Sequence, residues 1–245
     1  MLDTAFIHRR RGKNIGDLAC SPAGYFQFGD QASFDFKDDI PECDLAVLGG
    51  GQVFQSCVTS VLYQNPLAKR RVVWGVGISD KDRRSLDFDL LNASCNLIST
   101  RNWGVENCEF VPCVSAMSTH FDDPADPVHD VVLFYHALKS EGLTRVDDIP
   151  ERSNHHGTMK DAISFLASGE TVVTNSYHGT YWAMCLGRKV LCVPFNQKFQ
   201  HFQENPVMGD ATDWPKQINR AERRSETLGQ ARVLNERFYD KVRNI

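Results

Sequence analysis

The sequence lacks the features that would place it in a membrane, secreted or low-complexity class. No stretch of about 18 consecutive apolar residues occurs, so we expect no transmembrane helix. Residues 1–6 contain no apolar core of signal-peptide length, and Arg9-Arg10-Arg11 follows soon after them. With 42% apolar and 24% charged residues, the composition excludes a disordered or fibrous chain. We expect a globular, cytoplasmic protein.

Paired cysteine motifs and nucleotide-binding signatures are also missing. The chain has 8 cysteines, but no C-x-x-C pair that would indicate a zinc ribbon or a redox motif. Cys95, Cys185 and Cys192 stand inside apolar runs, where a free thiol behaves as a small hydrophobic side chain. Neither G-x-G-x-x-G nor a Walker sequence is present. We therefore predict reduced thiols, no bound metal, and no NAD, FAD or P-loop nucleotide.

The charge of the chain is unevenly distributed. The formal net charge is −4, which argues against a dedicated nucleic-acid binder. Residues 216–245 hold eight Lys or Arg and four Asp or Glu, so this tail carries +4 and the remainder −8. Apolar residues recur in the tail at helical spacing, and they are Ala231, Leu234, Phe238, Val242 and Ile245. We expect an amphipathic helix packed on its own protein, with contact to an anionic membrane surface as the alternative.

Short apolar runs alternate with amphipathic stretches, which is typical of parallel α/β folds. In the first half the pattern predicts strands at residues 4–8, 44–48, 71–78, 96–99 and 109–114, and helices at 53–68 and 86–93. In the second half it predicts strands at 130–135, 171–174 and 189–193, and helices at 158–167 and 179–186. Two prolines and three acidic residues interrupt the alternation at residues 122–127. The expected architecture is two Rossmann-like domains with parallel sheets, at residues 1–124 and 125–245, the second carrying the C-terminal helix.

In the first half, glycine and polar side chains follow the predicted strands, where parallel sheets bind ligands. The turn after the first strand contains Asn14, Gly16 and Asp17, and the second strand runs into Gly49-Gly50-Gly51. Glycine allows a close backbone approach to a ligand, although a tight turn uses the same residue. Arg101 ends a later strand and is suited to a carboxylate or a phosphate, or else it is a structural arginine.

The second half carries the most informative segment, Thr174-Asn175-Ser176-Tyr177-His178-Gly179-Thr180. His178 follows a predicted strand and is a candidate general acid or base. Ser176, Tyr177, Gly179 and Thr180 surround the start of the next helix, where backbone N–H groups suit a phosphate. His136 follows the strand at 130–135 and is a further candidate ligand contact, whereas a core histidine is the alternative for either residue.

In this order, these segments resemble the polysaccharide pyruvyl transferase family over residues 5–200. The matching segments are Asn14-Ile15-Gly16-Asp17, Leu48-Gly49-Gly50-Gly51, Trp74-Gly75-Val76-Gly77, Ile98-Ser99-Thr100-Arg101 and Thr174-Asn175-Ser176-Tyr177-His178-Gly179-Thr180, continuing through Ala183, Leu186-Gly187 and Val193-Pro194-Phe195. Many members have an arginine shortly before the His-Gly pair, where this chain has Asn175-Ser176-Tyr177. Members also commonly carry an aspartate where this chain reads Pro112-Cys113-Val114-Ser115-Ala116.

The resemblance implies a compact relative of two-domain, GT-B-type glycosyltransferases. It also implies transfer of pyruvate from phosphoenolpyruvate onto two hydroxyls of a sugar in a polysaccharide or its precursor. His178 would be the catalytic acid/base and Arg101 would hold the donor. The turn at Asn14, Gly16 and Asp17 would line the cleft together with Gly50 and Gly51. The expected partners are phosphoenolpyruvate and a glycan acceptor, with no other cofactor and no nucleic acid, and the cell location would be the cytoplasm or the inner face of the membrane.

Two other functions remain open at this stage. A glycosyltransferase using a nucleotide sugar would have the same architecture, but it needs a carboxylate for the ribose near the helix starts of the second domain. A sugar-binding relative without catalysis would account for the altered segment Asn175-Ser176-Tyr177.

Overall fold

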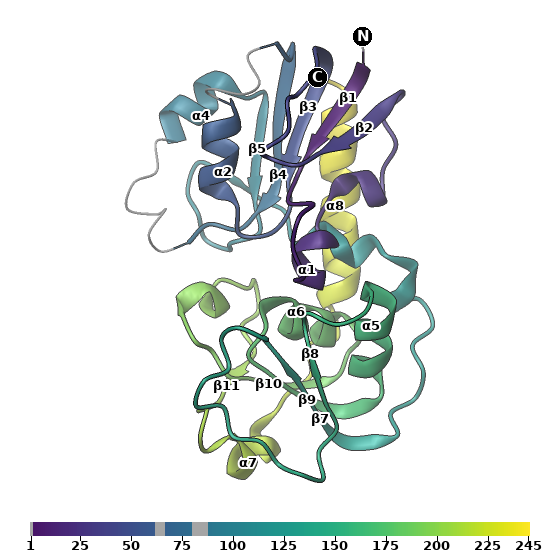
Figure 1. Cartoon of the computed structure of the whole chain (residues 1–245), viewed down its shortest axis with the longest axis vertical. Helices are drawn as coiled ribbons and strands as arrows, with labels where there is room; N and C mark the ends of the chain where they lie inside the picture. The colour runs from purple at the N-terminus through teal and green to yellow at the C-terminus, as the bar shows by residue number, and fades with distance from the viewer. Residues whose placement is uncertain (1, 62–66, 80–87) are drawn as a thin grey trace. The chain divides into compact units, whose positions relative to one another are not determined.

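The structure is a computed structural model of the chain, and it describes residues 2–61, 67–79 and 88–245 (Figure 1). The chain packs as two compact units. Unit 1 consists of Met1–Gly12, Asp17–Met117 and Ala231–Ile245. Unit 2 consists of Lys13–Gly16 and Ser118–Gln230.

Unit 1 is built on a parallel sheet of six strands in the order β2-β1-β3-β4-β5-β6. The strands are β1 (Leu2–Ile7), β2 (Gln31–Phe34), β3 (Cys43–Gly49), β4 (Arg70–Val76), β5 (Leu97–Thr100) and β6 (Glu109–Phe110). β3 and β4 are central and buried on both faces, which their nearly continuous apolar sequences predict. Since all six strands run the same way, their carboxyl ends meet at one edge of the sheet.

Helices cover both faces of this sheet (Figure 1). On one face, α2 (Phe54–Thr59) and α4 (Phe88–Ser94) bury Phe54 and Leu91 against the strands. On the other face, α8 (Thr227–Arg243) buries Phe238 and Val242 beside Trp74 of β4. Short 3-10 turns η1 (Pro22–Gly24) and η3 (Val114–Met117) complete the connections, and α1 (Ile15–Leu18) follows β1.

The predicted amphipathic C-terminal helix is α8, and the structure shows what its apolar stripe contacts. Ala231, Phe238 and Val242 are buried, and Phe238 stands edge-on to the Trp74 ring at 4.9 Å between centroids. The apolar stripe therefore packs on unit 1, as the first of the two sequence interpretations expects. Among the helices of the described residues, none combines the length and the apolarity needed to cross a bilayer.

Unit 2 contains a parallel sheet of five strands in the order β11-β10-β9-β7-β8. The strands are β7 (His129–Tyr135), β8 (Glu151–Ser153), β9 (Gly169–Thr174), β10 (Lys189–Cys192) and β11 (Val207–Met208). The remaining elements are η4 (Thr119–Phe121), α5 (Met159–Ala167), α6 (Tyr177–Cys185), η5 (Gln197–Gln200), α7 (Trp214–Gln217) and η6 (Ile218–Arg220).

Side-chain alternation along the strands of unit 2 gives the sheet two apolar faces. One face packs Leu133 and Leu191 around the indole of Trp214. The other face carries Phe134 and receives α5 and α6. α5 begins with a capping box between Thr158 and Asp161, so its start is defined by the local sequence.

The structure confirms an α/β chain with two parallel sheets, and the central strands and the helices α4, α5, α6 and α8 fall close to where the sequence predicts them. α2 (Phe54–Thr59) is shorter than the helix predicted at residues 53–68, and Leu67 and Ala68 are not helical. The strand predicted at residues 109–114 is shorter, because β6 ends at Phe110 and η3 begins at Val114. The sequence did not reveal β2, β8 and β11, which lie at or next to the sheet edges. Residues 62–66 of one predicted helix and 86–87 of another lie outside the described residues.

The boundary between the units differs from the predicted division at residues 124/125. It falls between Met117 and Ser118, and α8 from Ala231 onward packs with unit 1, not with the second half. The reason is the apolar stripe of α8, which fits beside Trp74. The segment Lys13–Gly16 belongs with unit 2 because the Ile15 N–H donates to the Asn154 carbonyl at 3.0 Å.

Candidate functional site

Both sheets have the same topology, and this topology identifies one edge of each as the place for a ligand. In unit 1 the chain leaves β1 for β2 on one side and reaches β3 on the other. In unit 2 it leaves β7 for β8 and then reaches β9 on the opposite side. Open parallel sheets bind ligands at the carboxyl ends of the strands where the order reverses. The candidate positions are therefore the ends of β1 and β3 in unit 1, and of β7 and β9 in unit 2.

In unit 2, His178 lies at this edge, in the first turn of α6. Ser176 caps the helix, and its hydroxyl accepts a hydrogen bond from the Gly179 N–H at 3.3 Å. The Thr180 N–H and hydroxyl both donate to the Ser176 carbonyl, at 2.9 and 3.0 Å. A Cβ on Gly179 would lie 2.6 Å from a ring carbon of Phe134, so glycine lets α6 approach the sheet. Gly179 and Thr180, predicted to bind a ligand, thus have a local role in fixing the helix start.

The His178 imidazole is held within unit 2 by the turn that follows β1 in sequence. A Cβ on Gly16 would lie only 2.0 Å from His178 Nδ1, so the Gly16 backbone packs directly on the ring. The Asn14 side chain accepts a hydrogen bond from the Gly16 N–H at 3.1 Å and fixes this turn. On α6, the Trp182 and Tyr177 rings lie 5.3 and 5.5 Å from the His178 ring. Asn14, Gly16, Tyr177 and His178, all predicted as site residues, are therefore brought together.

His136 and Asn175 connect the ends of β7 and β9. The Asn175 Oδ1 accepts from the His136 N–H at 2.7 Å, and its Nδ2 donates to Lys139 O and Ser140 Oγ, both at 2.9 Å. The His136 Nδ1 accepts from the Leu138 N–H at 3.2 Å, which assigns the ring proton of a neutral imidazole to Nε2. His136 thus lies at the predicted edge, with its Nδ1 bonded within its own loop.

Asn154 is a site residue that the sequence reasoning missed. It follows β8, its Oδ1 accepts from the Ala137 N–H at 3.0 Å, and its carbonyl holds Ile15. Its Nδ2 is buried and makes no hydrogen bond to any described residue. Because a buried amide donor without a partner is unfavourable, Nδ2 is a candidate contact for a ligand or a water. The feature of the sequence that could have identified Asn154 is its position, because His136, Asn154 and Asn175 each come directly after a strand.

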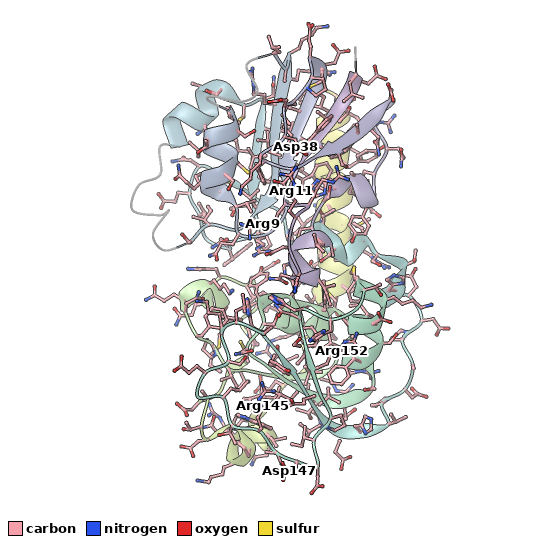
Figure 2. All side chains as sticks on the ribbon, in the orientation of Figure 1. Arg9, Arg11, Asp38, Arg145, Asp147 and Arg152 are labelled. Carbon is pink, nitrogen blue, oxygen red and sulfur yellow. The ribbon has the colours of Figure 1, made fainter. Side chains whose placement is uncertain are left out.

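The glycine loop after β3 forms the corresponding edge of unit 1. Gly50 and Gly51 have φ of +93° and +74°, conformations that favour glycine. A Cβ on Gly51 would lie 2.9 Å from Asp17 Oδ1, so the loop packs against that carboxylate. Asp17 in turn accepts from the Arg9 guanidinium at 3.3 Å. Figure 2 shows Arg9, the ion-pair partner of Asp17, just after the end of β1.

Arg101 directly follows β5 at the same edge of unit 1. Its guanidinium lies against Gly77, where a Cβ would be 2.8 Å from Nε and 2.9 Å from the nearer terminal nitrogen. The next residue, Asn102, accepts from the Ile78 N–H at 3.0 Å and donates to the Ile78 carbonyl at 3.1 Å. The Gly77 N–H also donates to the Gly51 carbonyl at 2.8 Å. Arg101 and the glycine loop, predicted separately, thus belong to one edge.

Two thiols stand close together in unit 1. Cys20 Sγ and Cys113 Sγ are 3.3 Å apart, and Cys113 Sγ lies 3.2 Å from Ser115 Oγ. Burial, followed by the contact with Cys113, raises the pKa of the Cys20 thiol well above its ordinary value. Taken alone, neither unit holds a set of three metal-ligating side chains among its described residues.

Comparisons with known proteins complete the description of the site. No family model matches the chain. Searches of curated proteins and of solved structures likewise give no match. The resemblance to polysaccharide pyruvyl transferases therefore stays a prediction from the motifs.

Proposed function

We propose that the chain is a ketal pyruvyltransferase that moves pyruvate from phosphoenolpyruvate onto two hydroxyls of a sugar. We further propose that its two units form a compact relative of the GT-B architecture. The observation that carries the proposal is the position of His178, a histidine at the reversal point of a parallel sheet, with its imidazole held between Gly16 and α6.

The reaction needs a group that gives and takes protons near neutral pH, and imidazole is the side chain suited to this. A proton from His178 goes to the methylene carbon of phosphoenolpyruvate, which leaves an oxocarbenium-like centre at the adjacent carbon. One sugar hydroxyl adds to this centre and returns a proton to the histidine. The carbon–oxygen bond to phosphate then breaks, and the second hydroxyl closes the ketal as its proton passes to the departing phosphate. Hydrogen phosphate and the pyruvate ketal are the balanced products.

Phosphoenolpyruvate carries a carboxylate and a phosphate, so the enzyme also needs cationic or N–H donors. Arg101 in unit 1 is the arginine that we assign to anion recognition, since guanidinium binds either group through two parallel hydrogen bonds. In unit 2 the N–H donor that supports the proposal is the Asn154 amide.

A nucleotide-sugar transferase is the alternative, and one observation favours phosphoenolpyruvate over it. The residues directly after β7, β8 and β9 are His136, Asn154 and Asn175. None of the three is a carboxylate that would accept from ribose hydroxyls.

The test is transfer of label from isotopically labelled phosphoenolpyruvate to a panel of glycan acceptors. The wild-type protein should yield a labelled ketal and inorganic phosphate in equal amounts. His178→Gln should lower the rate by roughly 10²–10⁴-fold with the folded structure retained, since it removes the acid/base. His129→Gln, a change at an exposed histidine, is the matched control and should transfer normally. A His178→Gln variant with wild-type turnover would falsify the assignment.

A further inference from the structure

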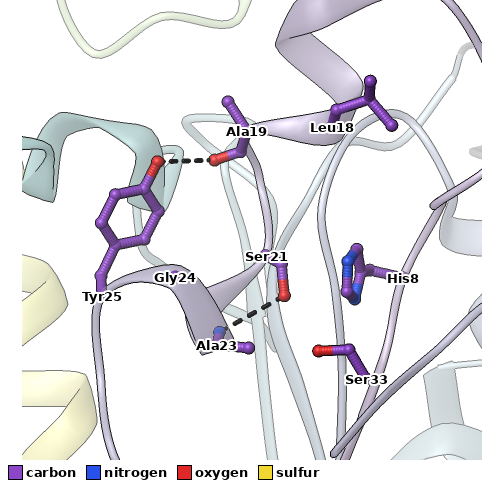
Figure 3. Close-up of a pocket in the computed structure, with 8 residues that line it drawn as sticks. All are labelled: His8, Leu18, Ala19, Ser21, Ala23, Gly24, Tyr25 and Ser33. Carbon is purple, nitrogen blue, oxygen red and sulfur yellow. Dashed lines mark hydrogen bonds between the residues drawn. The ribbon is translucent and has the colours of Figure 1, made fainter.

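A cavity of about 300 Å³ opens in unit 1, beside the end of β1. It is lined by His8, Leu18, Ala19, Ser21, Ala23, Gly24, Tyr25 and Ser33 (Figure 3). The His8 ring and the hydroxyls of Ser21 and Ser33 gather on one side of the close-up, at the reversal point of the sheet. None of these residues belongs to the site residues predicted from the sequence.

His8 gives this cavity an unused polar atom. The residue is only 8% exposed, and its Nδ1 makes no hydrogen bond to any described residue. Its backbone N–H is bonded to the Phe34 carbonyl at 3.0 Å, so the main chain at this position is fixed. A buried ring nitrogen without a partner costs free energy unless something in the cavity bonds to it. The site is thus built to accept a hydrogen-bonding group.

The lining carries no full charge. Burial, and next the charge of Arg10, lower the pKa of His8 to about 4, so its ring is neutral near pH 7. Two nearby arginines are paired with carboxylates: Arg9 with Asp17, and Arg11 with Asp38, which are both labelled in Figure 2. Arg10 donates to the Ser33 carbonyl but does not line the cavity. An anionic or cationic ligand would therefore find no counter-charge among the lining residues.

The remaining lining combines apolar groups with serine hydroxyls. Leu18, 41% exposed, contributes a large apolar side chain to the lining. The Tyr25 hydroxyl donates to the Ala19 carbonyl at 2.9 Å, so this ring contributes mainly its apolar surface. The Ser21 hydroxyl accepts from the Ala23 N–H at 3.3 Å and keeps its own proton available for donation.

We propose that this cavity binds one neutral sugar ring, with the ring's apolar face toward Leu18 and Tyr25 and its hydroxyls bonded to His8 Nδ1, Ser21 and Ser33. A sugar combines a patch of C–H groups with several neutral hydroxyls, which matches this lining. The volume lies at the lower limit of ligand cavities, about 300–1,000 Å³, so it suits a single ring and not a nucleotide. The inference concerns unit 1 alone, and its choice of a sugar rests on the proposed function, whose acceptor is a sugar.

The test is direct binding to the full chain in the absence of phosphoenolpyruvate, so the result does not depend on the transfer reaction. The probes are methyl glycosides of glucose, galactose and mannose, with glucuronate as the charged comparison. Imidazole nitrogen signals in NMR, assigned with His8→Gln, report whether a sugar reaches His8. At least one neutral glycoside should shift the Nδ1 signal of His8 in a saturable way, and glucuronate should bind more weakly.

Variants then identify the contacts. His8→Leu should weaken binding about tenfold, because the sugar hydroxyl loses its partner. His8→Gln, which keeps a donor and an acceptor, should recover part of the affinity. Ser33→Ala should weaken binding a few-fold, and it provides a second test if His8→Leu does not fold. Ser225→Ala, at an exposed serine, is the matched control. Glycoside binding that is absent, or that is unchanged in both His8→Leu and Ser33→Ala, would overturn the proposal.

Discussion

At the scale of single residues, His178 and Gly16 form the most constrained pair of the candidate site. They are 162 positions apart in the chain, yet a methyl group on Gly16 would overlap the imidazole at 2.0 Å from Nδ1. Position 16 therefore has to be glycine, because a side chain there would overlap the His178 ring. The Gly16 backbone in turn limits where that ring can lie.

Gly16→Ala should displace the His178 ring and lower the free energy of unfolding by about 1–3 kcal/mol, the usual cost of overpacking. Pyruvyl transfer should fall more steeply than stability, because the acid/base leaves its position. Urea unfolding and the labelled-donor assay measure the two effects. The control is Gly229→Ala on α8, where an added Cβ meets nothing within 4 Å and should leave stability unchanged or slightly higher. Equal behaviour of the two variants would contradict the packing described.

His8 should make the stability of unit 1 depend on pH. Its pKa is about 4 in the folded chain and 6.5 in the unfolded chain, so the unfolded state binds more protons between these values. The stability that the neutral ring contributes is complete above pH 6.5 and is lost as the pH falls toward 4, by about 3 kcal/mol in total. Arg10 and Asp35 are the charged groups that act on this ring, with Arg10 lowering and Asp35 raising its pKa.

The measurement is the free energy of unfolding from pH 7 to pH 4 for the wild type and His8→Gln. The difference in the free energy of unfolding between wild type and His8→Gln should change by about 3 kcal/mol over this pH range. The other histidines contribute equally to both proteins. His129→Gln, an exposed position, should follow the wild-type profile. Parallel profiles for wild type and His8→Gln would show that His8 titrates normally.

Part of the candidate site could be predicted residue by residue, because glycine, histidine and arginine after an apolar strand are visible in sequence. His178, Gly16, Gly51 and Arg101 were found in this way. Asn154 and His8 were not, since their importance comes from a buried nitrogen without a partner. Burial of one side-chain atom depends on packing between distant segments, which no local pattern contains.

At the scale of elements, buried strands and capped helices were predictable, and edge strands were not. β3 and β4 are long and apolar, and α5 has its capping box, so each carries a local signal. β2 and β8, of 4 and 3 residues, are half-exposed and too short for a period to be recognised. The surface on which α8 packs could not be predicted either, because an apolar stripe along a helix does not show which surface it contacts.

Asn235 is the polar group that fixes α8 on unit 1. Its Oδ1 accepts from Trp74 Nε1 at 2.9 Å, and its Nδ2 donates to the Pro112 and Ala231 carbonyls at 3.2 and 2.9 Å. Asn235→Ala should lower the free energy of unfolding by about 2–4 kcal/mol, because Trp74 and Pro112 keep buried polar groups without partners. Urea unfolding followed by tryptophan fluorescence measures this.

Asn244→Ala serves as the control, since Asn244 is exposed and its side-chain amide donates to the Asp240 carbonyl at 2.7 Å. It should change stability by less than about 0.5 kcal/mol. A similar value for Asn235→Ala would mean that α8 is held by its apolar contacts alone.

At the scale of the whole molecule, the two units repeat one strand order on different sequences. β1 and β7 hold equivalent places in their sheets, so His8 and His136 are topological counterparts, each directly after the first strand. The residues after the second strands, Asp35 and Asn154, both accept a hydrogen bond from the loop that follows the first strand. This correspondence explains why the candidate ligand-binding residues of each unit lie at the carboxyl ends of its strands.

The central claim is that the chain recognises phosphoenolpyruvate, and the thermal unfolding of the whole protein tests it most directly. The melting temperature is measured with phosphoenolpyruvate, with a set of nucleotide sugars, and with phosphate as the comparison. Phosphoenolpyruvate at about 100 times its Kd should stabilise the fold by about 2.7 kcal/mol, and nucleotide sugars should leave it unchanged. Stabilisation by a nucleotide sugar and not by phosphoenolpyruvate would contradict the account.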